Sequence, residues 1–259
     1  MANIKYADPS YTLITPTDDD QVMFRTGSGT DGRAPLVQPK GYIDGLKMTW
    51  VSATQIQVSA GAAYVPGPKR IAELSAATTL TPSLAANTWY HLFLTVSGAT
   101  VGVEAVTTAP AAAYYGTARA KTGDTSRRYI GSFLTDGSAA IWRFMHSDGG
   151  VQYLTNLVTP FRVLNGGTST TRTSVSLSGV VPITSGVVFL NAINNGDQQL
   201  YIDLPEIGNV GTSSRYTCLA NQRTPLITAA PSLALQYLYG VAPSGSGAFI
   251  DVWGYRYDR

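Results

Sequence analysis

Residues 45–67 alternate apolar and polar side chains, and this two-residue period is the feature that most constrains the fold. Successive side chains of a β-strand point to opposite faces, so the pattern predicts strands with one buried face. The expected buried positions are Leu46, Met48 and Trp50 in a first strand and Ile56, Val58 and Ala60 in a second. No helical period occurs in this stretch, and the same pattern recurs toward the end of the chain.

The other segments predict further short strands separated by turns. Trp89–Ser97 is expected to form a hairpin with residues 101–105, and residues 128–134 to pair with 141–146 across Asp136-Gly137. Beyond residue 150 the expected strands are 155–164, 171–177, 186–193, 199–204, 215–220, 225–228, 232–239 and 248–257. Short strands at this spacing are typical of all-β folds, and we expect two antiparallel β-sandwich or jelly-roll-like domains.

Turn-rich stretches divide the chain into three parts. Residues 1–40 have no sustained period, so they predict an extended N-terminal arm that becomes ordered on a partner. The Ser-Asp-Gly-Gly sequence at 147–150 is the expected boundary between a domain at 41–148 and a second domain at 149–259. Residues 74–87 are expected to be a connection with a short helical turn, and residues 107–126 to form a long loop.

Composition argues against several classes of partner and cofactor. Charged residues make up 13% of the chain and the net charge is +2, so the concentrated basic face needed for nucleic acid is not expected. The single cysteine, Cys218, is expected to be a buried thiol, because it has no second cysteine for a disulfide or a metal cluster. The acidic run at 18–20 lacks the spacing of a calcium loop and predicts a turn or a helix cap. We therefore expect no metal and no cofactor.

The targeting signals are also missing from the sequence. The first residues contain no apolar core of a signal peptide, and no run of about 18 apolar residues predicts a membrane span. We expect synthesis in a cytoplasm without membrane insertion, followed by delivery through lysis or as part of a particle.

Catalytic motifs do not emerge from the sequence. The two histidines, His91 and His146, lie within or at the end of predicted strands, where packing roles are typical. Residues 116–122 imitate the end of a phosphate loop but carry Ala120 where a glycine is required. A glycosidase needs two convergent carboxylates, and none of the 16 acidic residues stands in an apolar setting. We expect no catalytic residues, with polysaccharide depolymerisation as the least favoured alternative.

Aromatic and basic residues supply the remaining candidates for a binding site. Tyrosine combines apolar area with a hydroxyl at low entropic cost, which suits binding surfaces. The candidate receptor-binding residues are Tyr237, Tyr239, Trp253, Tyr255, Tyr257, Arg119 and Lys121. The alternatives are that the aromatic residues fill a core or a subunit interface, and that the basic residues lie in a solvated loop.

Three segments resemble a module of tail-tip, baseplate and tail-fibre proteins of tailed bacteriophages. They are GLKMTWVSATQIQVSAGAAYVPG at 45–67, LAANTWYHLFLTVSGATVGVEAVTTAP at 84–110 and YYGTARAKTGDTSRRYIGSFLTDGSAAIWRFMH at 114–146. The resemblance implies a β-rich virion component, usually a homotrimer, that takes part in host attachment. The chain lacks the glycine-repeat or heptad shaft of long fibres, which favours a compact tip.

The resulting hypothesis is a tail-tip protein that binds a bacterial surface receptor, either a glycan or a protein. Its arm is expected to attach to tail or baseplate proteins, and its C-terminal domain to present loops to the host. A homotrimer adds avidity, because linked weak sites exceed the affinity of one site by about 10² to 10⁴. The alternative is a purely structural baseplate or capsid-decoration protein.

Overall fold

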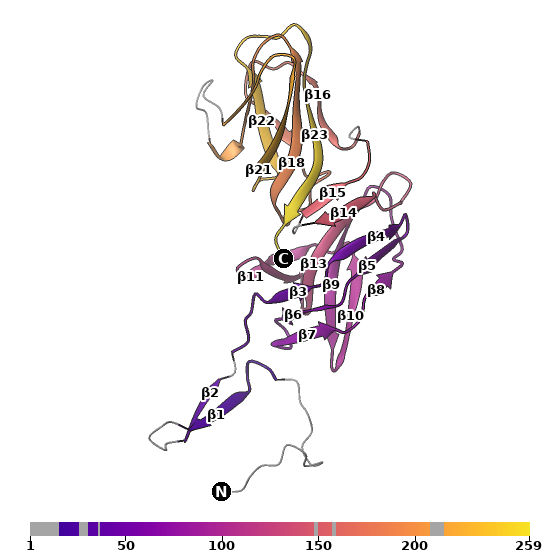
Figure 1. Ribbon diagram of the computed structural model, residues 1–259, viewed down its shortest axis with the longest axis vertical. Coiled ribbons are helices and arrows are strands. Elements are labelled where there is room, and N and C mark those ends of the chain that lie inside the picture. Colours follow the sequence, from indigo (N-terminus) through magenta and orange to yellow (C-terminus); the bar gives the residue numbers. More distant parts are fainter. Residues whose placement is uncertain (1–15, 26–30, 36, 148–149, 157–158, 208–214) are drawn as a thin grey trace.

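The computed structural model describes residues 16–25, 31–35, 37–147, 150–156, 159–207 and 215–259 (Figure 1). Within these ranges the secondary structure consists of antiparallel strands and one 3-10 turn, η1 (Pro205–Ile207). The all-β prediction is therefore confirmed. The hairpin of the arm lies at one end of an elongated molecule, and most of the chain after residue 160 lies toward the other end (Figure 1).

The N-terminal half contains a five-stranded sheet and two three-stranded sheets. The five-stranded sheet has the order β10-β9-β13-β12-β11, formed by β9 (Trp89–Ser97), β10 (Thr100–Val106), β11 (Pro110–Tyr115), β12 (Ala118–Lys121) and β13 (Asp124–Leu134). The smaller sheets are β3 (Ile43–Gly45), β6 (Gly61–Val65) and β7 (Arg70–Leu74), and β4 (Met48–Ser52), β5 (Gln55–Val58) and β8 (Thr78–Leu80). The two strands predicted from the alternation are present as β4 and β5, and Met48 and Val58 are buried opposite each other. Ala60, which was expected to be buried, lies beyond the end of β5 and is exposed.

Three predictions for this half are wrong. Residues 107–126 are not a loop but contain β11, β12 and the start of β13, since alanine-rich strands give a weak sequence signal and depend on pairing with a stronger neighbour. Residues 74–87 contain β8 and no helical turn. Residues 141–146 do not pair back along β13 beyond one bridge, Thr135 to Ile141.

The C-terminal half contains a six-stranded and a four-stranded sheet. The six-stranded sheet has the order β14-β15-β23-β18-β21 with β16 also on β23, formed by β14 (Phe144–Ser147), β15 (Gly150–Tyr153), β16 (Arg162–Gly167), β18 (Ser185–Gly196), β21 (Gln222–Ala229) and β23 (Gly245–Tyr257). The other has the order β17-β22-β19-β20, formed by β17 (Thr173–Ser176), β19 (Leu200–Asp203), β20 (Tyr216–Cys218) and β22 (Ala234–Tyr239). The strand expected at 155–164 begins only at Arg162, because Pro160 has no N–H for a ladder.

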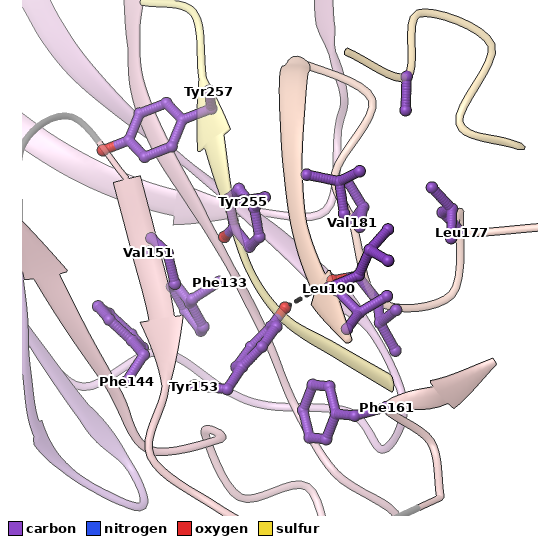
Figure 2. Close-up of a cluster of buried hydrophobic side chains, with 14 of the residues drawn as sticks. Phe133, Phe144, Val151, Tyr153, Phe161, Leu177, Val181, Leu190, Tyr255 and Tyr257 are labelled. Atoms are coloured by element: carbon purple, nitrogen blue, oxygen red, sulfur yellow. Dashed lines mark hydrogen bonds between the residues drawn. The ribbon is translucent and has the colours of Figure 1, made fainter. Parts of the chain in front are cut away.

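The predicted boundary at 147–150 falls inside the β14–β15 hairpin, with residues 148–149 outside the described part. Strand β14 precedes this boundary in the sequence and yet pairs into the six-stranded sheet of the C-terminal half. Buried apolar residues form one cluster that extends through both halves. Figure 2 shows part of it, with Phe133, Phe144, Tyr153 and Tyr255 among the side chains drawn.

Tyrosine hydroxyls connect the two halves within this cluster. The Tyr255 hydroxyl donates to the carbonyl of Ser132 at 2.9 Å, and the Tyr129 hydroxyl lies 2.7 Å from Oγ1 of Thr184. Burial raises the pKa of Tyr255 well above its usual value and that of Tyr129 to about 12. Both hydroxyls therefore keep their protons and remain hydrogen-bond donors at neutral pH.

A polar cluster fixes the base of the N-terminal arm, which carries the hairpin of β1 (Gln21–Arg25) and β2 (Asp31–Pro35). Asp18 accepts hydrogen bonds from the Tyr64 hydroxyl at 2.5 Å and the Gln38 N–H at 2.9 Å. The Gln38 side chain accepts the N–H of Ile71 at 2.6 Å. The hydrogen bond from Tyr64 lowers the pKa of Asp18. The acidic run forms a turn, as predicted, and one of its carboxylates holds the arm against β6 and β7.

One buried side chain ties the turn after β18 to the four-stranded sheet. The Asn194 amide donates to the carbonyls of Gln198 at 2.7 Å and Cys218 at 3.1 Å, and Oδ1 accepts the Tyr239 hydroxyl at 2.7 Å. Asn194 and Tyr239 are fully buried, and Cys218 is a buried free thiol, as expected. Water therefore has no access to replace these hydrogen bonds.

We expect Asn194→Ala to lower the free energy of unfolding by about 2–4 kcal/mol, because it leaves several buried polar groups without partners. Asn195→Ala is the matched control, since the same side chain one residue later is exposed, and it should change stability by less than about 0.5 kcal/mol. Urea unfolding of both variants measures the difference. Equal losses in the two variants would contradict this role for Asn194.

Candidate functional site

The structure places four of the predicted receptor-binding residues in the core. Tyr237, Tyr239, Tyr255 and Tyr257 are 5%, 0%, 0% and 4% exposed. Their burial removes them from any surface that could contact a receptor and agrees with the alternative of core packing. The buried tyrosine hydroxyls of β23 form hydrogen bonds within the chain, as the Tyr255 hydroxyl does with the carbonyl of Ser132.

The predicted basic residues lie on β12, in the N-terminal half, and are held by local partners. Nζ of Lys121 forms an ion pair with Glu104 at 2.9 Å, and Nη1 of Arg119 donates to the carbonyl of Ala111 at 3.1 Å. Both side chains are half-buried in paired strands rather than in the solvated loop that was expected. The structure does not bring them together with Trp253 on β23, so the predicted set does not form one site.

Trp253 is the predicted aromatic residue that reaches the surface, and a β-bulge directs it there. Phe189 of β18 pairs with Gly254 and Leu190 pairs with Val252, which leaves Trp253 as an extra residue on β23. Such bulges turn a side chain away from its regular position. The Trp253 ring stacks on Phe189, with centroids 4.9 Å apart and an angle of 29° between the planes.

Trp253 belongs to the face of the six-stranded sheet that points away from the four-stranded sheet. On β18 the inward residues Val188, Leu190 and Ala192 are fully buried, so the alternate residues point outward. We call this surface the outer face; it consists of Arg162 on β16, Val187, Phe189, Asn191 and Ile193 on β18, Arg223, Pro225, Ile227 and Ala229 on β21, and Phe249, Asp251, Trp253 and Arg256 on β23.

The outer face combines aromatic and aliphatic side chains with arginines. Ile227 is 62% exposed, whereas neighbouring side chains shield Phe189 to 7% and Ile193 to 8%. The β16, β18, β21 and β23 strands that carry this face lie in the part of the molecule farthest from the arm (Figure 1). Contiguous exposed apolar groups rimmed by polar ones are typical of interaction surfaces.

A small pocket lies at one end of the outer face. It has a volume of about 140 Å³ and is lined by Arg162, Ile193, Asn195, Arg223 and Phe249. Ile193 pairs with Arg223 on one side and with Phe249 on the other, so these three residues form a row across β21, β18 and β23. We call this pocket the arginine notch.

An ion pair fixes one wall of the arginine notch. Nε of Arg162 donates to Oδ1 of Asp251 at 2.7 Å and Nη2 donates to Oδ2 at 3.1 Å. The same guanidinium lies over the Phe249 ring, 5.0 Å from its centroid. The hydrogen bond with Asp251 raises the pKa of Arg162. Two contacts therefore hold this side chain in one orientation, and its charge is permanent.

A second pocket, the junction cleft, lies between the two halves. It has a volume of about 270 Å³ and is lined by Trp89, His91, Ala109, Ser178, Val181, Ile183 and Leu233. Behind it runs a chain of hydrogen bonds: Nδ1 of His91 lies 2.7 Å from the Ser132 hydroxyl, which lies 2.8 Å from the Tyr129 hydroxyl. Ser132 is fully buried, and a serine nucleophile must reach its substrate, so this arrangement fits packing rather than acyl transfer.

The described residues bring together no group of three or more His, Cys, Asp or Glu of the kind that could hold a metal ion. In the same part of the chain, no helix has the length and apolar character needed to cross a membrane.

Comparison with known proteins adds no assignment. No protein-family model matches the chain, and no curated protein sequence matches it. The features that bear on function are therefore the outer face and the resemblance of residues 45–146 to phage tail modules.

Most residues of the outer face were not predicted from the sequence as site residues. A signal was present in residues 186–193, GVVFLNAI, which are apolar at both inward and outward positions. A strand with one solvated face carries polar residues at its outward positions. The outward Val187, Phe189 and Ile193 therefore indicate a second face that something covers. The two arginines of the notch come from β16 and β21. They lie close together only because of how these strands pair with β23 and β18.

The histidine of the junction cleft makes stability depend on pH. Burial lowers the pKa of His91 to about 4, from 6.5. The unfolded chain takes up this proton near pH 6.5 and the folded chain only near pH 4, so the free energy of unfolding falls as the pH drops through this window. We expect protonation of His91 to lower the free energy of unfolding by about 3 kcal/mol between pH 7 and pH 4. In His91→Gln, urea unfolding at several pH values should show a correspondingly smaller loss.

His146 serves as the internal comparison, because burial also lowers its pKa to about 4. The double variant His91→Gln/His146→Gln should flatten the profile further than either single change. A pH profile of His91→Gln parallel to that of the parent chain would show that His91 does not titrate in this way.

Proposed function

We propose that this chain is a virion protein of a tailed bacteriophage that sits at the tail tip and attaches the particle to a bacterial surface receptor. The single observation that carries the proposal is the outer face, where half-buried aromatic rings lie beside exposed apolar and arginine side chains far from the arm. The resemblance of residues 45–146 to phage tail modules supports it independently. The chain acts by binding, without catalysis and without a cofactor.

The chemistry of the outer face suits recognition. Aromatic residues and arginine contribute most of the binding energy at many interfaces. Trp253 and Phe249 provide aromatic area on β23, while Arg223 is an exposed cation on β21, on the other side of β18. In this proposal these side chains contact the receptor, and the buried tyrosines only hold the sheet in place.

The proposal assigns the arm to attachment and the two halves to sandwich-like domains. The base of the arm, held by Asp18 and Gln38, connects tail or baseplate proteins to the body of the chain. Three copies form a homotrimer on the particle, so that three outer faces engage one cell and weak single contacts suffice.

The alternative function is that of a structural baseplate or capsid-decoration protein. The exposed apolar row of Pro225, Ile227 and Ala229 on β21 also fits a contact with another virion protein. The two functions differ in one respect, since only a receptor-binding protein attaches to cells by itself.

We expect the fluorescently labelled chain to bind cells of the bacterium that the encoding phage infects and to compete with phage adsorption. Ile227→Asp should weaken cell binding at least about 10-fold, because it places a charge among the exposed apolar side chains of the contact surface. Ile183→Asp is the matched control, being the same change at a side chain of similar exposure, 64% against 62%, beside the junction cleft. It should bind as the parent chain does.

Absence of both binding and competition would overturn the receptor function and favour the structural alternative. Equal losses in the two variants would instead place the contact outside the outer face. Light scattering on the same preparations should give the mass of three chains, and a monomer at every concentration would contradict the trimer.

A further inference from the structure

The arginine notch contains a cation without a partner. Arg223 is exposed, and the described part of the chain gives its guanidinium no ion pair and no hydrogen bond. On the opposite wall, the contacts of Arg162 to Asp251 use Nε and Nη2. Nη1 of Arg162 and all the guanidinium nitrogens of Arg223 therefore remain free to donate hydrogen bonds to a ligand from two sides of one pocket.

The charge balance at this place favours an anion. Asp251 is the acid on the outer face, and Arg162 already neutralises it. Among the described residues, no acid forms an ion pair with Arg223. Its positive charge therefore remains unpaired on the surface that the proposed function assigns to the receptor.

The floor and the rim of the notch indicate what carries the anion. Ile193 and Phe249 form an apolar floor, and the exposed amide of Asn195 stands at the rim. A volume of about 140 Å³ corresponds to the space of roughly five water molecules. It accommodates one acidic substituent with adjacent C–H groups, while the rest of a larger ligand lies along the outer face.

We propose that the arginine notch binds the anionic group, a carboxylate or a phosphate, of an acidic glycan on the host surface. The inference rests on the proposed function, because it names the receptor class for the same face. Arginine forks bind carboxylate and phosphate oxygens through paired, charge-assisted hydrogen bonds. The ion pair with Asp251 holds Arg162 in place, and Arg223 supplies the net charge.

The test measures binding of the full chain to three immobilised polymers: polygalacturonic acid, which presents carboxylates, poly(glycerol phosphate), which presents phosphates, and neutral dextran. We expect at least one of the two anionic polymers to bind, dextran not to bind, and rising salt to weaken the interaction. Arg223→Gln should lower the affinity about 10-fold or more. The polymer with the tighter binding identifies carboxylate or phosphate as the group recognised.

Arg256→Gln is the matched control. It removes the same charge from the same face, but Arg256 pairs with Val187, six residues along β18 from Ile193, or about 20 Å away. We expect less than a twofold change in its affinity. Equal losses in Arg223→Gln and Arg256→Gln would reveal nonspecific attraction and overturn the notch as the site.

The same variants separate this inference from the proposed function. If neither anionic polymer binds while the chain still attaches to cells in an Ile227-dependent manner, the notch proposal is wrong and the receptor function stands. If an anionic polymer binds in an Arg223-dependent manner while no cell attachment occurs, the notch stands and the receptor function fails.

Discussion

The pairing of β18 with β23 is the interaction on which the rest of the structure depends. These are the longest strands, with 12 and 13 residues, and they pair from Ser185 opposite Tyr257 to Gly196 opposite Gly245. Strands β15 and β16 add to β23, and β21 adds to β18. Their inward side chains build the core, and their outward side chains build the outer face.

The same pair also carries the connection between the halves. Near the end of β23, the Tyr255 hydroxyl reaches Ser132 on β13, and the final residue, Arg259, donates from Nη1 to the carbonyl of Leu46 at 2.9 Å. A buried hydroxyl without a partner is costly, so these contacts fix the depth to which the C-terminal strand inserts. The tyrosines of β23 therefore orient the outer face relative to the N-terminal half instead of contacting a receptor.

The sequence predicts those parts of the fold that local pattern controls. Alternation in residues 45–67 and the apolar run Trp89–Ser97 led to strands that the structure contains. The alanine-rich β11 and β12 were missed, because their pairing depends on β13 and not on their own residues. The pairing of β14 with β15 was missed for a similar reason, since Ser-Asp-Gly-Gly suits both a linker and a hairpin turn.

The candidate site was harder to predict than the fold. An aromatic residue on a strand gives the same sequence signal whether it faces the core or the solvent, and the bulge at Trp253 reverses the simple alternation at that point. The residues that line the arginine notch come from four strands that are distant in sequence. No pattern within a single segment therefore indicates this pocket. Only the apolar outward positions of β18 gave a local signal.

Hydroxyl-radical footprinting of the chain, free and incubated with bacterial cell envelopes, reports which side chains become covered and so tests the proposed binding role of the outer face. We expect reduced oxidation of Trp253, Phe249 and Ile227 in the bound state. Oxidation of Val37 and Tyr115, which are 68% and 58% exposed near the arm, should not change. Protection of Val37 and Tyr115 with unchanged oxidation of the outer face would contradict this role.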